Sequence, residues 1–254
     1  MARGAIEHPR ASEPALRPGQ TALVTGASSG IGRAIALALS AEGLTVRLVG
    51  RNRAALARVA RLAGRDARIS VADITTRNGI AALARATRPA LDVLVHCAGA
   101  YLKGPVGSIR AESWSALDAV NLHAPILLTA ACLPQLRAAT GQIVFINSTA
   151  GLQAGPGMLP YAAGKHGLRC AVDILRQEVN PDGLRVVSIF PGRTDTPMQR
   201  AVLAAEGRPA PRGTLMRPED VAGLVLAALK LPLTAEVTDI VMRPLRPLTR
   251  APKR

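Results

Sequence analysis

Short apolar runs alternate with longer amphipathic segments along most of this chain. Each short run is rich in Val, Ile and Leu and is a candidate buried strand, whereas the longer segments repeat their apolar residues with the period of an α-helix. The predicted strands are residues 21–25, 45–49, 68–71, 91–96, 142–146, 184–189 and 238–241. The predicted helices are residues 31–41, 53–62, 77–87, 111–137, 161–179 and 218–229.

Strands that alternate with helices indicate repeated strand–helix–strand units, whose right-handed crossovers place helices on both faces of a parallel sheet. The sequence therefore predicts an α/β fold: a Rossmann-like, doubly wound, mostly parallel seven-stranded sheet. At 254 residues the chain fits one such domain, expected over residues 19–244. Residues 1–18 are predicted to be a disordered leader, and residues 245–254 a basic C-terminal tail. The segment 197–215 is interpreted as loop-like and able to form a lid.

The composition narrows the classes of function. Nearly half of the residues are apolar and only 2% are aromatic, so the core must be built mainly from Ala, Val, Leu and Ile. The formal charge is +15, from 32 basic and 17 acidic residues, and arginines are spread along the chain. This excess is interpreted as a codon bias or as a weak general affinity for polyanions. No specific nucleic-acid binding is expected, because the chain has almost no aromatic side chains on which bases stack.

Cysteine, histidine and hydropathy place further limits on the protein. Cys97, Cys132 and Cys170 are far apart and form no CxxC pair, which indicates neither a disulfide framework nor a zinc site. The histidines show no spacing typical of metal ligands, so no metal is expected. The N-terminal stretch lacks the apolar core of a secretory signal, and the strongly apolar runs are short for a membrane span. These features predict a soluble, cytoplasmic protein.

Three side chains and one glycine-rich turn carry the candidate chemistry. Tyr161 and Lys165 are four positions apart, so they share one helix face and the Lys165 ammonium can lie under the Tyr161 phenol. Ser148 stands thirteen positions before Tyr161. Residues 25–32 read Thr-Gly-Ala-Ser-Ser-Gly-Ile-Gly after the first predicted strand, where a doubly wound sheet binds a pyrophosphate. Together these features indicate carbonyl chemistry on a nicotinamide cofactor.

In their order and spacing, these motifs resemble those of the classical short-chain dehydrogenase/reductase family over residues 21–244. The resemblance implies that the catalytic residues are Asn121, Ser148, Tyr161 and Lys165. It implies that the cofactor is bound by Gly26, Ser28, Ser29, Gly30, Ile31, Gly32, Asp73, Ile74, Ala98, Gly99, Tyr161, Lys165, Pro191, Gly192, Thr194 and Thr196. Asp73 is expected on the adenine side, and Pro191, Gly192 and Thr196 beside the nicotinamide.

One segment departs from the family pattern. Where the family has Asn-Asn-Ala-Gly after the fourth strand, this chain has His96 and Cys97 before Ala98 and Gly99. The small residues that let a cofactor approach the backbone are kept, whereas two amide side chains are replaced. We expect the replacement to affect sheet stability and adenine-side packing and to leave the catalytic residues untouched.

The resemblance also implies a role for each catalytic residue. Tyr161 is expected to be the general acid in reduction and, as phenolate, the base in oxidation. Its pKa, about 10 when free, is expected to move towards working pH through Lys165 and an oxidised nicotinamide. Ser148 is expected to hydrogen-bond the substrate oxygen and hold it near the phenol. Asn121 is expected to hold a water that links Lys165 to solvent.

The end of the second predicted strand indicates which cofactor is used. The chain there carries Arg51 and lacks the acid with which NAD-dependent proteins hydrogen-bond the ribose 2′-hydroxyl. The Arg51 guanidinium can pair with a 2′-phosphate instead. We therefore expect Arg51 to bind the cofactor, and NADPH (NADP) to be preferred over NADH. Arg33 and Arg53 are weaker candidates for the same contact.

Residues 101–107, residues 152–160 and the segment after Thr196 are expected to set substrate choice. Their apolar side chains favour an uncharged or partly hydrophobic carbonyl compound, with Arg193 a candidate contact for an acidic group. These apolar side chains are Leu152, Met158, Leu159 and Met198. The segment 197–215 is short for enclosing a large polycyclic substrate. The predicted function is NADPH-dependent reduction of a small to medium ketone or aldehyde, reversible as alcohol oxidation.

A second interpretation stays open: a cofactor-binding regulator or scaffold without turnover. The presence of Ser148, Tyr161 and Lys165 argues against it, because a binding-only protein does not need all three. Members of the family commonly form dimers and tetramers through long helices. A homodimer or homotetramer is therefore expected, with residues 111–137 and 161–179 as candidate contacts. The basic tail is interpreted as solvated or as crossing onto a neighbouring subunit.

Overall fold

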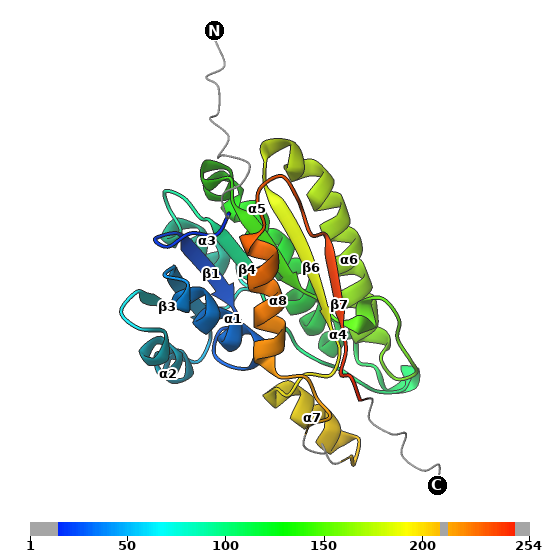
Figure 1. The fold of residues 1–254 in the computed structure, drawn as a ribbon. Helices are drawn as coiled ribbons and strands as arrows, with labels where there is room; N and C mark the ends of the chain where they lie inside the picture. Colours follow the sequence, from blue (N-terminus) through cyan, green and yellow to red (C-terminus); the bar gives the residue numbers. More distant parts are fainter. Residues whose placement is uncertain (1–14, 209–212, 247–254) are drawn as a thin grey trace.

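Parallel strands form the centre of the structure, a computed structural model that describes residues 15–208 and 213–246 (Figure 1). The strands are β1 (Thr21–Thr25), β2 (Thr45–Gly50), β3 (Ala67–Val71), β4 (Val93–His96), β5 (Gln142–Ile146), β6 (Arg185–Pro191) and β7 (Asp239–Met242). Their order in the sheet is β3-β2-β1-β4-β5-β6-β7, and every neighbouring pair is parallel. The strand order reverses between β1 and β4, so the predicted doubly wound seven-stranded sheet is confirmed.

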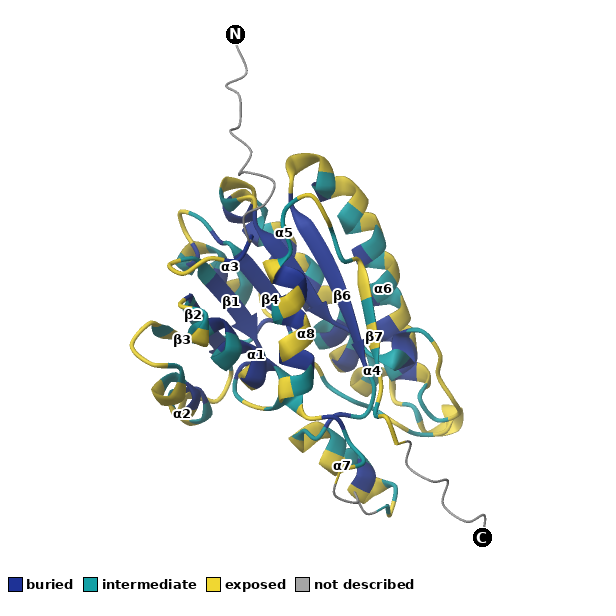
Figure 2. Ribbon diagram, in the orientation of Figure 1, coloured by how far each residue is buried: buried dark blue, intermediate teal, exposed yellow. Residues whose placement is uncertain are grey.

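Helices cover both faces of this sheet (Figure 1). They are α1 (Gly30–Ala41), α2 (Arg53–Ala63), α3 (Arg77–Ala86), α4 (Ala111–Asp118), α5 (Ala124–Ala139), α6 (Leu159–Val179), α7 (Pro197–Ala205) and α8 (Pro218–Lys230). Side chains of α1, α2 and α8 pack with the sheet in one apolar core, and side chains of α3, α5 and α6 pack in a second. The sheet is therefore buried on both faces, as Figure 2 shows for its central strands.

Alternate residues of each central strand enter the two cores. In β1, Ala22 and Val24 lie in the core under α1 and α8, whereas Leu23 lies in the opposite core. In β4, Val95 lies in the core under α1 and α8, and Leu94 lies in the opposite core. A strand with both faces buried needs apolar residues at every position, which explains the continuous apolar runs of the sequence.

The segment predicted as one helix over 111–137 is interrupted. A π-helical turn, Ala119–His123, separates α4 from α5 and carries Asn121. By length and composition, Ala111–Ala139 would be apolar enough to cross a membrane, with a mean hydropathy of 1.5 in its most apolar window. In this fold Leu128 and Leu136 of α5 lie in the second core. Packing inside the protein therefore accounts for part of this apolar character, since 39% of that window is buried in this fold.

The segment predicted as loop-like over 197–215 begins instead with helix α7, so this prediction was wrong for residues 197–205. The Thr196 side chain accepts a hydrogen bond from the Gln199 backbone N–H at 3.1 Å, and Pro197 occupies the first turn. Figure 1 shows α7 beyond the carboxyl ends of the strands. A helix this short has too few apolar repeats to be recognised from its period.

The termini of the predicted domain are only partly described. Residues 1–14 of the predicted leader, and residues 247–254 of the predicted tail, lie outside the described residues. Ala15 and Leu16 are buried, and Leu16 belongs to the core under α1 and α8. The described fold thus begins a few residues before the predicted boundary at residue 19.

Candidate active site

A cavity of about 680 Å³ lies at the carboxyl ends of the strands. It collects nearly every residue that the sequence singled out. The predicted site residues that line it are Gly26, Ser28, Ser29, Gly30, Ile31, Gly32, Arg51, Asp73, Ile74, Ala98, Gly99, Ser148, Tyr161, Lys165, Pro191, Gly192, Thr194 and Thr196. Asn121 does not line the cavity. The topology therefore brings these dispersed positions together, as a doubly wound sheet does at its reversal point.

The turn between β1 and α1 brings bare backbone to the cavity. Gly26 and Gly30 have φ angles of +67° and +53°, in the left-handed region that favours glycine. A Cβ on Gly26 would lie 2.8 Å from the Ala98 backbone nitrogen, and one on Gly30 would lie 3.0 Å from Thr196 Cγ2. Within the described chain the Ser29 side chain does not cap α1, which leaves N–H groups of its first turn for an anion. This cradle fits the pyrophosphate of a dinucleotide.

Arg51 and Asp73 follow the neighbouring strands β2 and β3, and both line the cavity. Asp73 Oδ1 accepts hydrogen bonds from the Thr75 hydroxyl at 2.7 Å and from the Thr75 N–H at 2.9 Å. These bonds, with a smaller contribution from the Arg51 charge, lower the pKa of the Asp73 carboxyl. Arg33 and Arg53 do not line the cavity, so Arg51 is the predicted arginine that the fold places there.

Lys165 is fixed under the end of β5. Its Nζ donates to the Ile146 carbonyl oxygen at 3.0 Å, and its own carbonyl oxygen accepts from Asn147 Nδ2 at 3.2 Å. Lys165 is only 4% exposed, and this burial lowers its pKa to about 8. The ammonium is therefore held rigidly and changes charge in mildly alkaline solution.

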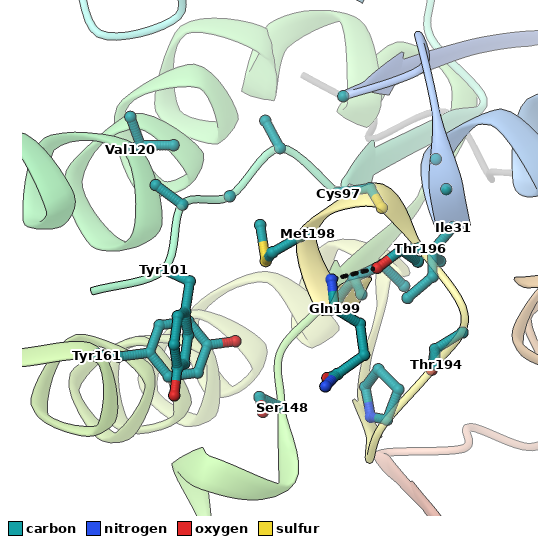
Figure 3. Close-up of a pocket in the computed structure, with 18 of the residues that line it drawn as sticks. Ile31, Cys97, Tyr101, Val120, Ser148, Tyr161, Thr194, Thr196, Met198 and Gln199 are labelled. Carbon is teal, nitrogen blue, oxygen red and sulfur yellow. Dashed lines mark hydrogen bonds between the residues drawn. The ribbon is translucent and has the colours of Figure 1, made fainter. Parts of the chain in front are cut away.

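Tyr161 lies on α6 with its ring against that of Tyr101. The ring centroids are 4.8 Å apart at an interplanar angle of 63°, and Figure 3 shows the two rings crossing in the cavity. Burial raises the pKa of Tyr161, a hydrogen bond with the Ser148 side chain lowers it, and Tyr101 raises it further. The net shift is upward, so the predicted downward shift does not occur in the protein alone. Desolvation of the phenolate is the larger effect here.

Ser148 and Asn121 form side-chain hydrogen bonds with the backbone after β5 and after β4. Ser148 begins a short 3-10 turn, and its hydroxyl accepts from the Ala150 N–H at 3.1 Å. Asn121, which is buried, accepts from the Ala100 N–H and donates to the Ala100 carbonyl, each at 2.9 Å. The Asn121 side chain thus fixes the position of Ala100 in the segment that follows β4. Its role in holding a water stays a prediction.

The segment after β6 closes the cavity on another side. The Gly192 N–H donates to the Met242 carbonyl at 2.8 Å, and the Thr194 hydroxyl donates to the Gly192 carbonyl at 3.1 Å. The Thr196 hydroxyl accepts from the Gln199 N–H, the dashed contact in Figure 3. Since that contact uses an oxygen lone pair, the hydroxyl proton of Thr196 remains able to donate to a ligand.

The two residues that depart from the family pattern fit the sheet without breaking it. The His96 ring stacks on Phe145, with centroids 4.7 Å apart, and His96 Nε2 lies 2.8 Å from the Thr129 hydroxyl. Burial lowers the pKa of His96 to about 3, so the ring is neutral. The Cys97 N–H donates to Thr25 Oγ1 at 3.0 Å. Strand β4 therefore keeps its pairing with both neighbours.

The substrate side differs in part from the sequence prediction. Met158 and Met198 line the cavity, whereas Leu152 and Leu159 do not, so these two leucines were wrongly included. Tyr101 lines it, as do Val202 and Glu206, which the sequence analysis did not single out. Glu206 was missed because its ion-pair partners are far from it in the sequence. Lys103 is 103 positions away and Arg193 is 13 positions away. No periodic signal marks such a contact.

In the described part of the chain, the acidic, histidine and cysteine side chains do not gather into a metal site. Across residues 15–208 and 213–246, no group of three or more His, Cys, Asp or Glu side chains is arranged to hold a metal ion.

This chain is similar to short-chain dehydrogenases and oxidoreductases in both sequence and structure. Residues 20–207 match the family model described as short chain dehydrogenase. An uncharacterized oxidoreductase of Staphylococcus epidermidis is 31% identical over 229 residues, which cover 89% of this chain and 97% of the relative. A metagenomic short-chain oxidoreductase in complex with NADP is 32% identical, with a TM-score of 0.77 and coverage of 91% of this chain and 98% of that one. A single-residue variant of the actinorhodin polyketide ketoreductase with NADPH is 29% identical, with a TM-score of 0.83 and coverage of 89% and 96%.

Proposed function

Because this chain belongs to the short-chain dehydrogenase/reductase family and is an oxidoreductase, we propose that it reduces a ketone or aldehyde with NADPH. The substrate is small to medium in size, uncharged and partly hydrophobic, and the reaction is reversible as alcohol oxidation. The observation that carries the proposal is the meeting of Ser148, Tyr161 and Lys165 with the glycine turn around one cavity. A regulator without turnover would not need these three side chains in one place.

The preference for NADPH rests on Arg51. Arg51 directly follows β2, lines the cavity and is exposed, so its guanidinium can pair with a 2′-phosphate. Asp73 follows the adjacent strand, and its carboxylate is engaged by Thr75. Two solved relatives, one with NADP and one with NADPH, support the same cofactor.

The geometry of the cavity supports a role for three side chains in the reaction. When bound, the cofactor supplies a hydride to the carbonyl carbon of the substrate. Ser148 hydrogen-bonds the carbonyl oxygen, and the Tyr161 hydroxyl gives that oxygen its proton, so that the product is an alcohol. The raised pKa of Tyr161 keeps the phenol protonated before the reaction, which suits reduction. Lys165 provides a fixed positive charge that offsets the charge left on Tyr161.

The substrate and assembly proposals rest on separate features. Tyr101, Met158 and Met198 give the cavity a mainly apolar wall, which favours an uncharged substrate.

Leu127 of α5 and Ile174 of α6 are 56% and 52% exposed, and burial of such side chains would drive formation of a homodimer or homotetramer. All three cysteines are free thiols, which accords with a reducing, cytoplasmic location.

The direct test is NADPH oxidation with a panel of small ketones, aldehydes and quinones, using wild type and Tyr161→Phe with NADH in parallel. We expect Tyr161→Phe to lower kcat/KM by about 1000-fold, since a positioned general acid contributes that order of rate. NADPH affinity should stay unchanged, because the ring is kept. Tight NADPH binding without turnover of any panel member would instead favour the regulator.

A further inference from the structure

An ion-pair cluster joins three separate segments on the substrate side of the cavity. Glu206 directly follows α7, Lys103 lies between β4 and α4, and Arg193 lies between β6 and α7. Lys103 Nζ is 2.7 Å from Glu206 Oε1, and Arg193 Nη2 is 3.0 Å from Glu206 Oε2. Arg193 Nη2 also donates to Glu206 Oε1, at 3.4 Å, so both cations bind the same carboxylate. Arg208 Nη1 lies 4.0 Å from the same group.

The cluster is partly withdrawn from solvent, with the anion at its centre. The Glu206 side chain is 12% exposed, whereas those of Lys103 and Arg193 are 41% and 35% exposed. Burial raises the pKa of Glu206, but hydrogen bonds from Lys103 and Arg193 outweigh it and lower the pKa overall. Glu206 is therefore ionised at neutral pH.

The cluster also lies close to the reacting groups. Glu206 and Arg193 line the same cavity as Tyr161. The charges of Lys103, Glu206 and Arg193 all act on the phenol of Tyr101, whose ring contacts that of Tyr161. A substrate held between Ser148 and Tyr161 would occupy the same cavity as Arg193 and Glu206.

We propose that Glu206 is a specificity-determining residue, an internal counter-ion that occupies the carboxylate position between Lys103 and Arg193. With that position filled, the Glu206 charge lowers the preference of the cavity for oxo acids relative to uncharged carbonyl compounds. This inference rests on the proposed function, since it concerns the substrate of the same site.

The physical basis is competition between two carboxylates for the same donors. Guanidinium and ammonium groups make their strongest hydrogen bonds to carboxylates, so an oxo acid would bind Arg193 and Lys103 well if they were free. Glu206 is covalently tethered beside them and has a high effective concentration. An incoming substrate carboxylate would also be repelled by Glu206 at short range in a partly desolvated site.

The test compares benzoylformate with its ethyl ester, which carry the same ketone and differ in charge. We measure kcat/KM for both with NADPH in wild type, Glu206→Gln and Glu206→Asp. Glu206→Gln keeps the shape and removes the charge, and we expect it to raise the acid-to-ester ratio by about tenfold. Glu206→Asp keeps the charge and should keep the wild-type ratio. Lys103→Gln added to Glu206→Gln should reverse part of the gain.

Arg200→Gln is the matched control on α7, the helix that Glu206 follows, because it breaks the solvent-exposed Arg200–Asp195 ion pair of 2.7 Å. We expect it to leave the ratio unchanged. If Glu206 only holds α7 in place, Glu206→Gln will change both substrates by the same factor, and the proposal is then wrong.

A binding measurement separates this inference from the proposed function. Calorimetric titration with benzoate and benzamide, with NADPH present, needs no turnover. We expect Glu206→Gln to bind benzoate about tenfold more tightly than wild type and to bind benzamide equally. No gain for benzoate overturns the role of Glu206, whereas absence of ester reduction by wild type counts against the reductase itself.

Discussion

The cofactor half of the cavity, formed by residues 26–32 with Arg51 and Asp73, is built mainly on backbone at the ends of adjacent strands. The substrate half, formed by Tyr101, Met198, Val202 and Glu206, is built on side chains from the β4–α4 connection, from α7 and from the residue that follows it. The first half needs only a short turn in one conformation. The second needs long-range contacts, such as the one between Lys103 and Glu206.

This difference shows which half can change without loss of the fold. The glycine turn is constrained, because a Cβ at Gly26 would meet the Ala98 backbone and one at Gly30 would meet Thr196. On the substrate half, Met198 and Val202 lie on the outlying helix α7 and are at least partly exposed. Loops and outlying helices tolerate substitution better than strand-end turns. The glycine turn should therefore tolerate substitution less well than the substrate half does.

Among the variants that distinguish the cofactor half from the substrate half, we expect Arg51→Glu to have the largest effect. It replaces a charge-assisted contact to a 2′-phosphate with a repulsion, so kcat/KM with NADPH should fall about 100-fold. With NADH, which has no 2′-phosphate, kcat/KM should change little. Steady-state kinetics with both cofactors and one substrate measures the difference.

Arg53→Glu is the matched control for that prediction, because Arg53 is exposed and does not line the cavity. If Arg53→Glu and Arg51→Glu lower kcat/KM with NADPH by similar factors, then general surface charge, rather than a contact from Arg51, governs NADPH use.

His96→Asn tests the buried support of the cofactor half. The folded-state pKa of His96 is about 3, below the value of about 6.5 for the unfolded chain. Between these pH values the unfolded chain binds more protons, so wild-type stability falls as the pH falls. The variant lacks this group. Between pH 7 and pH 5 the unfolding free energy of wild type should therefore fall by about 2 kcal/mol more than that of the variant. Urea denaturation at both pH values measures it, and parallel curves for the two proteins would contradict the assignment.

Val202→Trp gives the smallest effect and concerns the substrate half. Val202 lies on α7 and lines the cavity, so a larger ring there should narrow it. We expect kcat/KM for ethyl benzoylformate to fall about tenfold, with the dissociation constant for NADPH unchanged. Val202→Ala is the companion variant and should retain activity with this ester. A matching loss of NADPH affinity in the Trp variant would show that the two halves are coupled.

Much of the fold could be predicted because its signals are local. The predicted strands agree with β1 to β7 within about two residues at each end, since strands buried on both faces read as apolar runs. The π-helical turn that carries Asn121 was not predictable, because its insertion in a continuous helical pattern leaves no periodic mark. Helix α7 was missed because its 9 residues hold too few apolar repeats to show a helical period, although Thr196 and Pro197 are local signals of a helix start.

The amino-acid sequence by itself determined the strand–helix alternation, the glycine turn and the shared helix face of Tyr161 and Lys165, because each depends on neighbours within a few positions. Only the tertiary structure decided the direction of the Tyr161 pKa, which burial raises, and the neutral state of His96. It also decided that Glu206 lies between Lys103 and Arg193, while Leu152 and Leu159 stay outside the cavity. Desolvation and ion pairing depend on which distant segments meet, and that information exists only once the chain has folded.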